Sequence, residues 1–138
     1  MIKRLSHTSV FVLDQDSAYD FYVNKLGFEV RTDAAFGEGF RWLTVGPKGQ
    51  PDLEIALMPL HEGPHLPAEK VEVLRDLIAS HTFGAGVLET DDVQKEYDEL
   101  SAKGVEFVQA PEEQFYGIEA LFRDDSGNWF SLVQRTTT

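Results

Sequence analysis

The stretch HTSVFVLDQDSAYDFYVNKLGFEV, residues 7–30, decides the fold, because it predicts one strand, one helix and the start of a second strand. Successive side chains of a strand point to opposite faces, so residues 7–13 place Val10 and Val12 on one face. The other face begins with His7. This strand therefore has one apolar face and one face that opens with a histidine.

The helix of this stretch is predicted over about residues 16–26. Asp14 and its polar neighbours supply capping oxygens before it. Apolar side chains then recur at the helical spacing i, i+3, i+4 and i+7, at Tyr19, Tyr22, Val23 and Leu26. Gly27 follows and suits a left-handed C-terminal stop, after which Phe28 and Val30 resume the alternation of a strand.

The length and composition favour one domain that folds without disulfide bonds. A chain of 138 residues buries about two thirds of its unfolded surface when it folds. It has no cysteine, which excludes disulfides and thiolate metal sites and leaves His, Asp and Glu as the strong metal ligands. No apolar run of membrane-spanning length and no signal-peptide core is present, so we expect a cytoplasmic protein.

The net charge excludes two classes of partner. The chain carries 24 acidic and 12 basic residues, a formal net charge of −12. Such a charge repels nucleic acid and anionic membrane surfaces. We therefore expect neither nucleic acid nor a membrane as a partner, and we interpret the acidic residues as a solvated surface.

The rest of the first half predicts two strands and a connector with a helix. Residues 32–39 indicate a glycine-bearing loop, and residues 40–45 and 52–58 alternate as strands on either side of a turn. A connector carries His61 and His65 and leads to Pro67, a residue suited to the first turn of a helix. The apolar face of that helix is expected at Val71, Leu74, Leu77 and Ile78.

The second half repeats the element order of the first. Strands are predicted at residues 82–89, 105–109, 118–123 and 129–134, with one helix between the first two. A shift of 77 residues places Asp14 on Asp91 and Gly27 on Gly104. The helix caps, helix stops and turns agree together, which indicates an internal duplication.

Five segments of this chain, in order, resemble the vicinal oxygen chelate superfamily of glyoxalase I, bleomycin-resistance proteins and extradiol dioxygenases: HTSVFVLD, FYVNKLGFEV, DLEIALMP, TDDVQKEYDELSAKGVEF and FRDDSGNWFSLVQ. The resemblance implies an α+β fold in which two tandem βαβββ modules form a curled mixed sheet around a cavity. It implies one domain over residues 1–138, with module one at 1–58, a connector with a helix at 59–81 and module two at 82–138. It also implies a homodimer.

For metal-using members, the resemblance implies ligands from the first and fourth strands of each module. Module one offers His7 and Glu54, whereas module two offers Gly84 or Ala85 and, under the shift of 77, Ser131. Divalent Fe, Mn, Ni or Zn is therefore a possible cofactor with an incomplete ligand set. Replacement ligands are conceivable at His81, Glu119, His61 and His65, and for each histidine a structural or exposed role is the better prior.

Aromatic side chains indicate a ligand cavity on the His7 face. By alternation, that face should also carry Phe11, Phe40, Trp42, Met58 and Trp129, with Phe36, Phe115 and Tyr116 in loops beside it and Glu119 and Ser131 as polar groups. Aromatic rings supply large, flat contact areas that suit a planar organic ligand. The alternative is that these rings fill a solid core or a dimer interface.

Three functions remain open from the sequence. The first is bleomycin-resistance-type sequestration of a small hydrophobic or aromatic ligand, which would give antibiotic resistance without chemical change. The second is a divalent-metal glyoxalase-like lyase or isomerase, or an extradiol dioxygenase, that uses His7 and Glu54 with a further ligand. The third is a metal-free enzyme in which His7 and Glu54 form a base and its orienting carboxylate.

Overall fold

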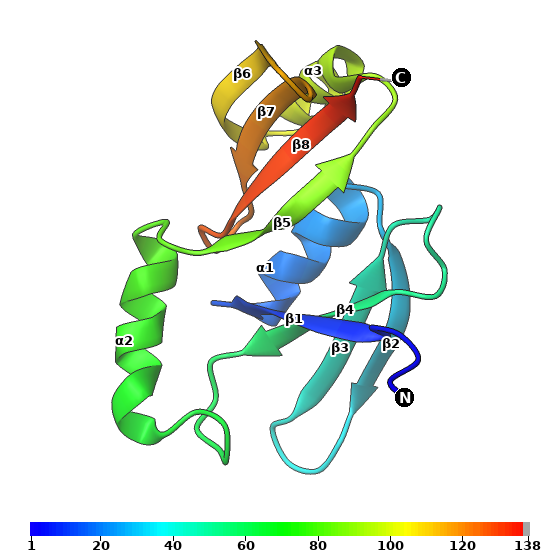
Figure 1. Ribbon diagram of the computed structural model, residues 1–138. Helices are drawn as coiled ribbons and strands as arrows, with labels where there is room; N and C mark the ends of the chain where they lie inside the picture. Colours follow the sequence, from blue (N-terminus) through cyan, green and yellow to red (C-terminus); the bar gives the residue numbers. More distant parts are fainter. Residues whose placement is uncertain (137–138) are drawn as a thin grey trace. The chain divides into compact units, whose positions relative to one another are not determined.

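The computed structural model describes residues 1–136, which form two compact units (Figure 1). The first unit is Met1–Asp76 and the second starts at Leu77. Among these described residues, no helix is both long enough and apolar enough to cross a membrane.

Unit one is a four-stranded mixed sheet with one helix segment packed on it. Its elements are β1 (His7–Val12), α1 (Gln15–Tyr19), η1 (Asp20–Lys25), β2 (Glu29–Ala35), β3 (Arg41–Gly46) and β4 (Glu54–Pro59), followed by α2 (Ala68–Ala79), which continues into unit two. The strand order is β1-β4-β3-β2, and only the β1–β4 pair is parallel. The strands β4 and β3 therefore lie inside the sheet, and β1 and β2 form its edges.

Unit two repeats this topology. Its elements are β5 (Gly84–Glu89), α3 (Val93–Ala102), β6 (Glu106–Gln114), β7 (Gly117–Arg123) and β8 (Trp129–Arg135). The strand order β5-β8-β7-β6, with a parallel β5–β8 pair, matches that of unit one strand for strand. The expected α+β fold of two βαβββ modules, each with a mixed sheet, is therefore confirmed.

The core of unit one lies on the sheet face that the alternation predicts. Val10 and Val12 of β1 and Ile55 and Leu57 of β4 are buried, and α1 packs against β4 (Figure 1). His7, at the start of β1, is exposed. One face of this sheet thus supplies the apolar core of the unit, and the other face is left for other contacts.

The first helix changes from α to π geometry half way along. The amide of Leu26 donates to the carbonyl of Phe21 at 2.9 Å, an i to i−5 bond, and Gly27 has a φ of +78°. The left-handed stop at Gly27 is therefore confirmed. The predicted inward face is wrong in part: the buried side chains are Ala18, Phe21 and Tyr22, because the small Ala18 rather than Tyr19 starts the face that packs on the sheet.

Two strands run further than predicted. Residues 32–35 belong to β2 rather than to a loop, because they pair with β3 after an irregularity between Val30 and Thr32. Likewise β6 extends to Gln114, paired with β7 through two further irregularities. Bulges interrupt the alternation of side chains between the two faces of a strand. The sequence pattern therefore did not predict these ends of β2 and β6 as strand.

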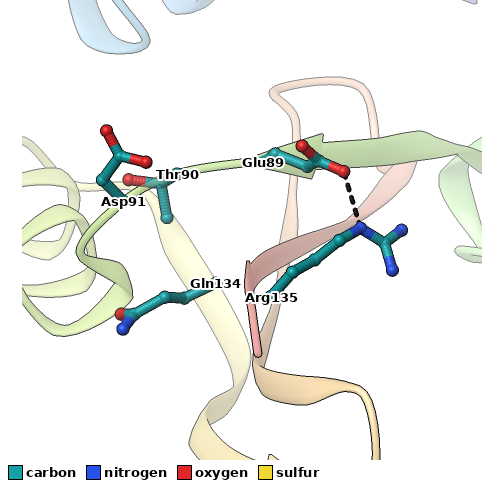
Figure 2. A pocket seen from close by; sticks show the side chains of 5 residues that line it. All are labelled: Glu89, Thr90, Asp91, Gln134 and Arg135. Atoms are coloured by element: carbon teal, nitrogen blue, oxygen red, sulfur yellow. Dashed lines mark hydrogen bonds and ion pairs between the residues drawn. The ribbon is translucent and has the colours of Figure 1, made fainter. Parts of the chain in front are cut away.

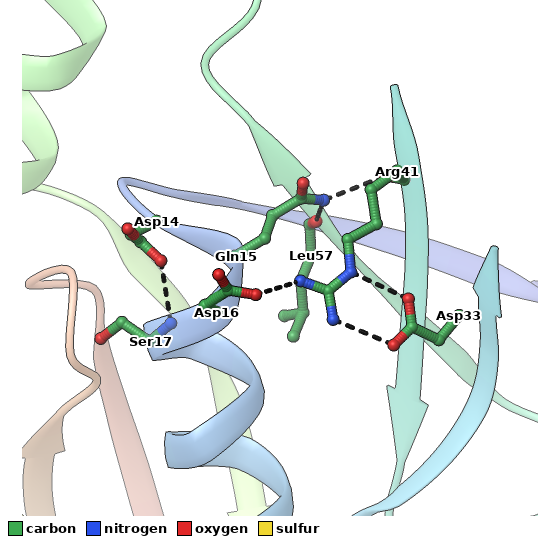
Figure 3. Close-up of polar contacts among 7 residues, drawn as sticks. All are labelled: Asp14, Gln15, Asp16, Ser17, Asp33, Arg41 and Leu57. Atoms are coloured by element: carbon green, nitrogen blue, oxygen red, sulfur yellow. Dashed lines mark hydrogen bonds and ion pairs between the residues drawn. The ribbon is translucent and has the colours of Figure 1, made fainter. Parts of the chain in front are cut away.

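The N-terminus of α1 is tied to the sheet by a charged cluster (Figure 3). The Arg41 guanidinium donates to both carboxylate oxygens of Asp33, at 2.8 and 2.9 Å, and to Asp16 at 2.7 Å. The hydrogen bond from Arg41 lowers the pKa of Asp33. Gln15 donates to the backbone carbonyls of Arg41 and Leu57, so one turn of helix is joined to both β3 and β4.

The core of unit two includes α3, whereas the apolar face predicted for α2 is buried only in part. Val93 and Leu100 of α3 are buried, and the rings of Phe122 and Phe130 stack with centroids 5.4 Å apart. On α2, Ile78 is buried, whereas Leu77 remains 37% exposed. The apolar face expected for α2 is therefore only partly covered by the chain.

Candidate functional site

His7 and Glu54 are brought together by strand pairing in unit one. They are register partners across the parallel β1–β4 pair, and His7 Nε2 lies 3.1 Å from Glu54 Oε2. Thr44 of β3 donates its hydroxyl to the other carboxylate oxygen, Glu54 Oε1, at 2.7 Å. The His7 side chain remains 44% exposed, so the pair is accessible from solvent.

Aromatic side chains predicted for ligand binding share this face. Phe11 pairs with Met58, four residues along β1 from the pair of His7 with Glu54. The ring centroids of His7 and Trp42 lie 6.2 Å apart. We call this surface of unit one the aromatic face; it carries His7, Phe11, Phe40, Trp42, Thr44, Glu54 and Met58. Phe11, Phe40, Trp42 and Met58 are half-buried, and Phe36, in the loop after β2, is exposed.

Three of the candidate ligand-binding residues form a cluster in unit two. Tyr116 donates its hydroxyl to Glu119 Oε1 at 2.6 Å, and the Ser131 hydroxyl forms a short hydrogen bond to Glu119 Oε2. The hydrogen bond to Glu119, with burial and the negative charge of Glu119 adding to it, raises the pKa of the Tyr116 phenol. Phe115, beside Tyr116 in the β6–β7 turn, is 97% exposed.

Each unit has a hydrogen-bonded pair of one hydroxyl and one carboxylate, but the strands that carry the two groups are exchanged between the units. Thr44 pairs with Ala56, and Glu119 pairs with Val133, which is Ala56 plus 77 residues. The position of Thr44 in unit one is therefore occupied by Glu119 in unit two, and that of Glu54 by Ser131. A uniform shift of 77 matches Thr44 with residue 121 instead of 119, so the exchange is invisible in the sequence alone.

The second-module position facing Ser131 differs from the expectation. Val87 pairs with Ser131 across β5 and β8, whereas Gly84 pairs with Trp129. An irregularity between Gly84 and Gly86 displaces the register, so the prediction of Gly84 or Ala85 at this position is wrong. The ring of Trp129 lies against Gly84, where a Cβ would be 2.6 Å from the ring.

The donors of neither unit fit a catalytic metal centre. A separation of 3.1 Å between Nε2 and Oε2 suits both a hydrogen bond and two ligands of one ion, so the number of donors decides. Catalytic zinc takes three protein ligands, and the iron triad takes two histidines and a carboxylate. Unit one supplies two donors, and within residues 1–136 no three or more His, Asp or Glu side chains gather as a possible metal site.

The histidines considered as replacement ligands have other surroundings. His81 has a φ of +67° at the end of α2, and its Nδ1 lies 3.2 Å from the carbonyl oxygen of Gly127. His61 and His65 are exposed in the connector. The structural role predicted for His81 is thus supported by a specific contact with the β7–β8 turn.

A hollow that the sequence did not predict lies in unit two (Figure 2). Its volume is about 640 Å³, and its lining residues are Glu89, Thr90, Asp91, Gln134 and Arg135. Figure 2 shows Arg135 paired with Glu89, at 2.6 Å from Nε to Oε1. Ligand pockets are mostly apolar, and every side chain lining this hollow is polar, so it does not suit an aromatic compound.

The family is decided by a comparison with family models. The model of the glyoxalase/bleomycin resistance protein/dioxygenase superfamily matches residues 4–132. This chain belongs to that superfamily. The superfamily fold agrees with the two modules of identical strand order, and the earlier resemblance is confirmed.

Several proteins are similar to this chain over nearly its whole length. The crystal structure of UcmS2 has 51% sequence identity and a TM-score of 0.90, covering 97% of this chain and 99% of that one. The crystal structure of TnmS3, an antibiotic binding protein from Streptomyces sp. CB03234, has 32% identity and a TM-score of 0.76, covering 98% of both chains. YurT of Bacillus subtilis (strain 168) is 37% identical over 129 residues, 93% of this chain and 96% of its own.

Proposed function

We propose that this superfamily member binds a small planar aromatic or hydrophobic compound on the aromatic face of unit one and sequesters it without chemical change. The observation that carries the proposal is the difference in side-chain burial between the two faces of the sheet. The core residues Val10, Val12, Ile55 and Leu57 are buried on one face. Phe11, Trp42 and Met58 on the other remain half-buried.

Half-exposed rings on one face offer affinity to a flat ligand. Covering about 100 Å² of one ring contributes roughly 2.5 kcal/mol at about 25 cal/mol per Å². Association costs several kcal/mol, so a single ring is too little and several rings that contact one ligand together are required. Phe11, Phe40, Trp42 and Met58 provide such a set, with His7 beside Trp42.

The similarity to TnmS3 supports binding rather than turnover. TnmS3 is described as an antibiotic binding protein, and it matches this chain over 98% of its length. The donor set supports the same choice, since His7 and Glu54 are fewer than the ligands of a catalytic metal. The sequestered compound would then be an antibiotic-like organic molecule, and protection would follow from tight binding alone.

Tryptophan fluorescence tests the proposal. The chain has two tryptophans, so Trp129→Phe leaves Trp42 as the reporter. We expect metal-free bleomycin or one of a set of neutral polycyclic aromatic compounds to quench Trp42 with a saturable curve. Phe11→Ala and Met58→Ala should each weaken binding by roughly 5- to 50-fold, the equivalent of about 1 to 2.3 kcal/mol.

The control is Val73→Ala, which shortens an exposed apolar side chain on α2 and should leave binding unchanged. Chromatography of the released compound should return it unaltered. Turnover of any compound on addition of Fe(II), Mn(II), Ni(II) or Zn(II) would contradict sequestration and favour metal chemistry. An absence of saturable quenching over the whole set would contradict binding on the aromatic face.

A further inference from the structure

A series of close polar contacts on unit one ends at a serine hydroxyl. Thr44 donates to Glu54 Oε1 at 2.7 Å, Glu54 Oε2 lies 3.1 Å from His7 Nε2, and His7 Nδ1 lies 2.9 Å from Ser6 Oγ. Ser6 is half-buried just before β1, and it is not part of the proposed ligand-binding set. The series therefore links a carboxylate, an imidazole and a hydroxyl in that order.

The roles of the two ring nitrogens of His7 depend on its tautomer. An ionised carboxylate only accepts, so the neutral tautomer that can donate to Glu54 carries its proton on Nε2. Nδ1 then carries a lone pair, and the Ser6 hydroxyl donates to it. This is the arrangement in which a histidine is ready to accept the proton of a serine nucleophile while a carboxylate stabilises the resulting imidazolium.

The backbone holds Ser6 in this position. The carbonyl of Ser6 accepts the amide of Glu54 at 2.9 Å, which extends the β1–β4 pairing by one residue. Arg4 donates to the carbonyl of Asp52 at 2.8 Å, so the segment before Ser6 is also fastened to the chain before β4. A nucleophile and base on a paired strand lose little freedom when they meet a substrate.

We propose that Ser6, His7 and Glu54 form a nucleophilic site that accepts the acyl group of small activated esters and hydrolyses it. Ser6 Oγ attacks the ester carbonyl and its proton moves to His7 Nδ1. The carbon–oxygen bond to the leaving group breaks, and the leaving alcohol takes its electron pair and the proton from His7. Water, deprotonated by His7, then releases the acid and restores Ser6, so ester and water become acid and alcohol.

In this site Ser6 and His7 are the catalytic residues, and Glu54 and Thr44 are positioning residues that act through His7. The inference does not rest on ligand sequestration: it shares His7, Glu54 and Thr44 with the aromatic face, but its nucleophile, Ser6, lies outside that face and acts on a different class of compound. Failure of one proposal therefore leaves the other standing. Labelling of Ser6 and quenching of Trp42 report on them separately.

A fluorophosphonate probe tests the nucleophile on the full-length protein. Attack by Ser6 forms a phosphorus–oxygen bond, expels fluoride and gives the proton to His7, leaving a stable adduct that intact mass and peptide mapping locate. We expect one adduct, on Ser6, that is absent in Ser6→Ala. His7→Ala should slow labelling about 100-fold, the lower end of what a positioned base contributes.

Ser9→Ala is the matched control, because Ser9 lies on the same strand beyond His7 and its loss should leave the labelling rate within a factor of two. The second measurement is the ¹⁵N NMR spectrum of the His7 ring, which should show the Nε2–H tautomer in the folded protein and lose that preference in Glu54→Gln. An adduct elsewhere, no adduct, equal labelling of Ser6→Ala, or a predominant Nδ1–H tautomer would each overturn the proposal.

Discussion

At the scale of single residues, buried and half-buried carboxylates of this chain are held by several donors each. Asp124, in the β7–β8 turn, is 6% exposed and accepts the amides of Ser126, Gly127 and Asn128, each at 2.9 Å. The side-chain amide of Asn128 donates to its other oxygen at 3.0 Å. One side chain thus satisfies the backbone of a whole turn.

Asp124→Ala should destabilise the protein by about 3 kcal/mol, because buried amides lose a charged acceptor. Chemical denaturation monitored by circular dichroism measures the loss. Glu62→Ala, at an exposed position of the connector, is the control and should change the free energy of unfolding by less than about 0.5 kcal/mol. Equal effects of the two substitutions would show that the turn does not depend on the Asp124 carboxylate.

The hydroxyl of Tyr116 should ionise above the usual pH range of tyrosine. Its hydrogen bond to Glu119 raises its folded-state pKa, whereas the unfolded-state pKa is about 10. A raised folded-state pKa means that the stabilising contribution is complete below about pH 10 and is lost as the pH rises through the folded-state pKa. The ¹³Cζ signal of Tyr116 should therefore titrate above pH 10.

Glu119→Gln provides the comparison for this titration. The amide removes both the charge and a carboxylate acceptor, so the pKa of Tyr116 should fall toward that of free tyrosine. Tyr116→Phe should abolish the corresponding pH dependence of stability in the alkaline range. An unchanged Tyr116 titration in Glu119→Gln would contradict the assignment of the shift to this hydrogen bond.

At the scale of elements, the ends of the helices share one backbone conformation. Gly27 ends the first helix with a φ of +78°, and Gly104 follows α3 with a φ of +90°. After α2 the same place is taken by His81, with a φ of +67°. The amides of His81 and Thr82 donate to Ile78 and Leu77 in the pattern of a Schellman motif, so a histidine stands where a glycine is usual.

Gly27→Ala should cost about 1 kcal/mol, because alanine resists a positive φ even where its methyl group meets nothing. No atom lies within 4 Å of a Cβ built at Gly27, so the cost is conformational. Gly49→Ala is the matched control, since it too has open space but no positive φ, and it should be neutral within about 0.5 kcal/mol. Equal unfolding midpoints for both variants would contradict this account.

His81→Ala should be more destabilising than His81→Gly. Alanine keeps the strain of the positive φ and loses the contact between His81 Nδ1 and the Gly127 carbonyl, whereas glycine loses the contact but relieves the strain. We expect a difference of about 1 kcal/mol between the two variants in denaturant titrations. A more stable His81→Ala variant would show that the backbone there is not strained.

The sequence pattern predicts these elements well where a side chain sets the backbone. Asp14 caps its helix as expected, through the amide of Ser17, and α3 is capped by Asp92, next to the Asp91 that the shift of 77 matches with Asp14, through the amide of Lys95. The π turn after Tyr19 and the bulges in β2 and β6 were not predicted, because they arise from pairing and packing with distant residues. Local propensity contains no information about those partners.

At the scale of the whole molecule, the duplication explains why the fold was predictable and the site only in part. The helix stop Gly27 recurs as Gly104 at a shift of 77, and the helix cap Asp14 recurs as Asp92 at a shift of 78, so the module order followed from the sequence. The pairing of His7 with Glu54 was also predictable, since both lie on the face opposite the core. The exchange of Thr44 and Glu54 for Glu119 and Ser131 required the strand registers, because β3 and β7 align at a shift of 75 and not 77.

A double-mutant cycle tests the exchange. Ser131→Glu alone places a second carboxylate beside Glu119 and should destabilise unit two, because two adjacent charges repel and a buried charge lacks a donor. Glu119→Thr alone should cost less, since it leaves two neutral hydroxyls. The double variant, Glu119→Thr with Ser131→Glu, restores the arrangement of unit one and should recover about 1 to 3 kcal/mol of coupling energy.

Urea denaturation of the four proteins measures the coupling. Thr44→Ser is the control in unit one, because it keeps the hydroxyl donor to Glu54 and should cost only about 1 kcal/mol, the loss of one buried methyl group. Additive effects of the two substitutions in unit two would contradict the equivalence of these positions. A double variant less stable than either single variant would contradict it too.

The exchanged pair also constrains how the two halves of this chain diverged from a common ancestor. Conversion of one arrangement into the other by single replacements passes either through two carboxylates or through two hydroxyls at neighbouring strand positions. The first intermediate places two carboxylates side by side, where their charges repel, whereas the second is neutral and its two hydroxyls can pair with each other. We infer that the ancestral half carried hydroxyls at both positions or passed through that state, and that each half later acquired its carboxylate on a different strand.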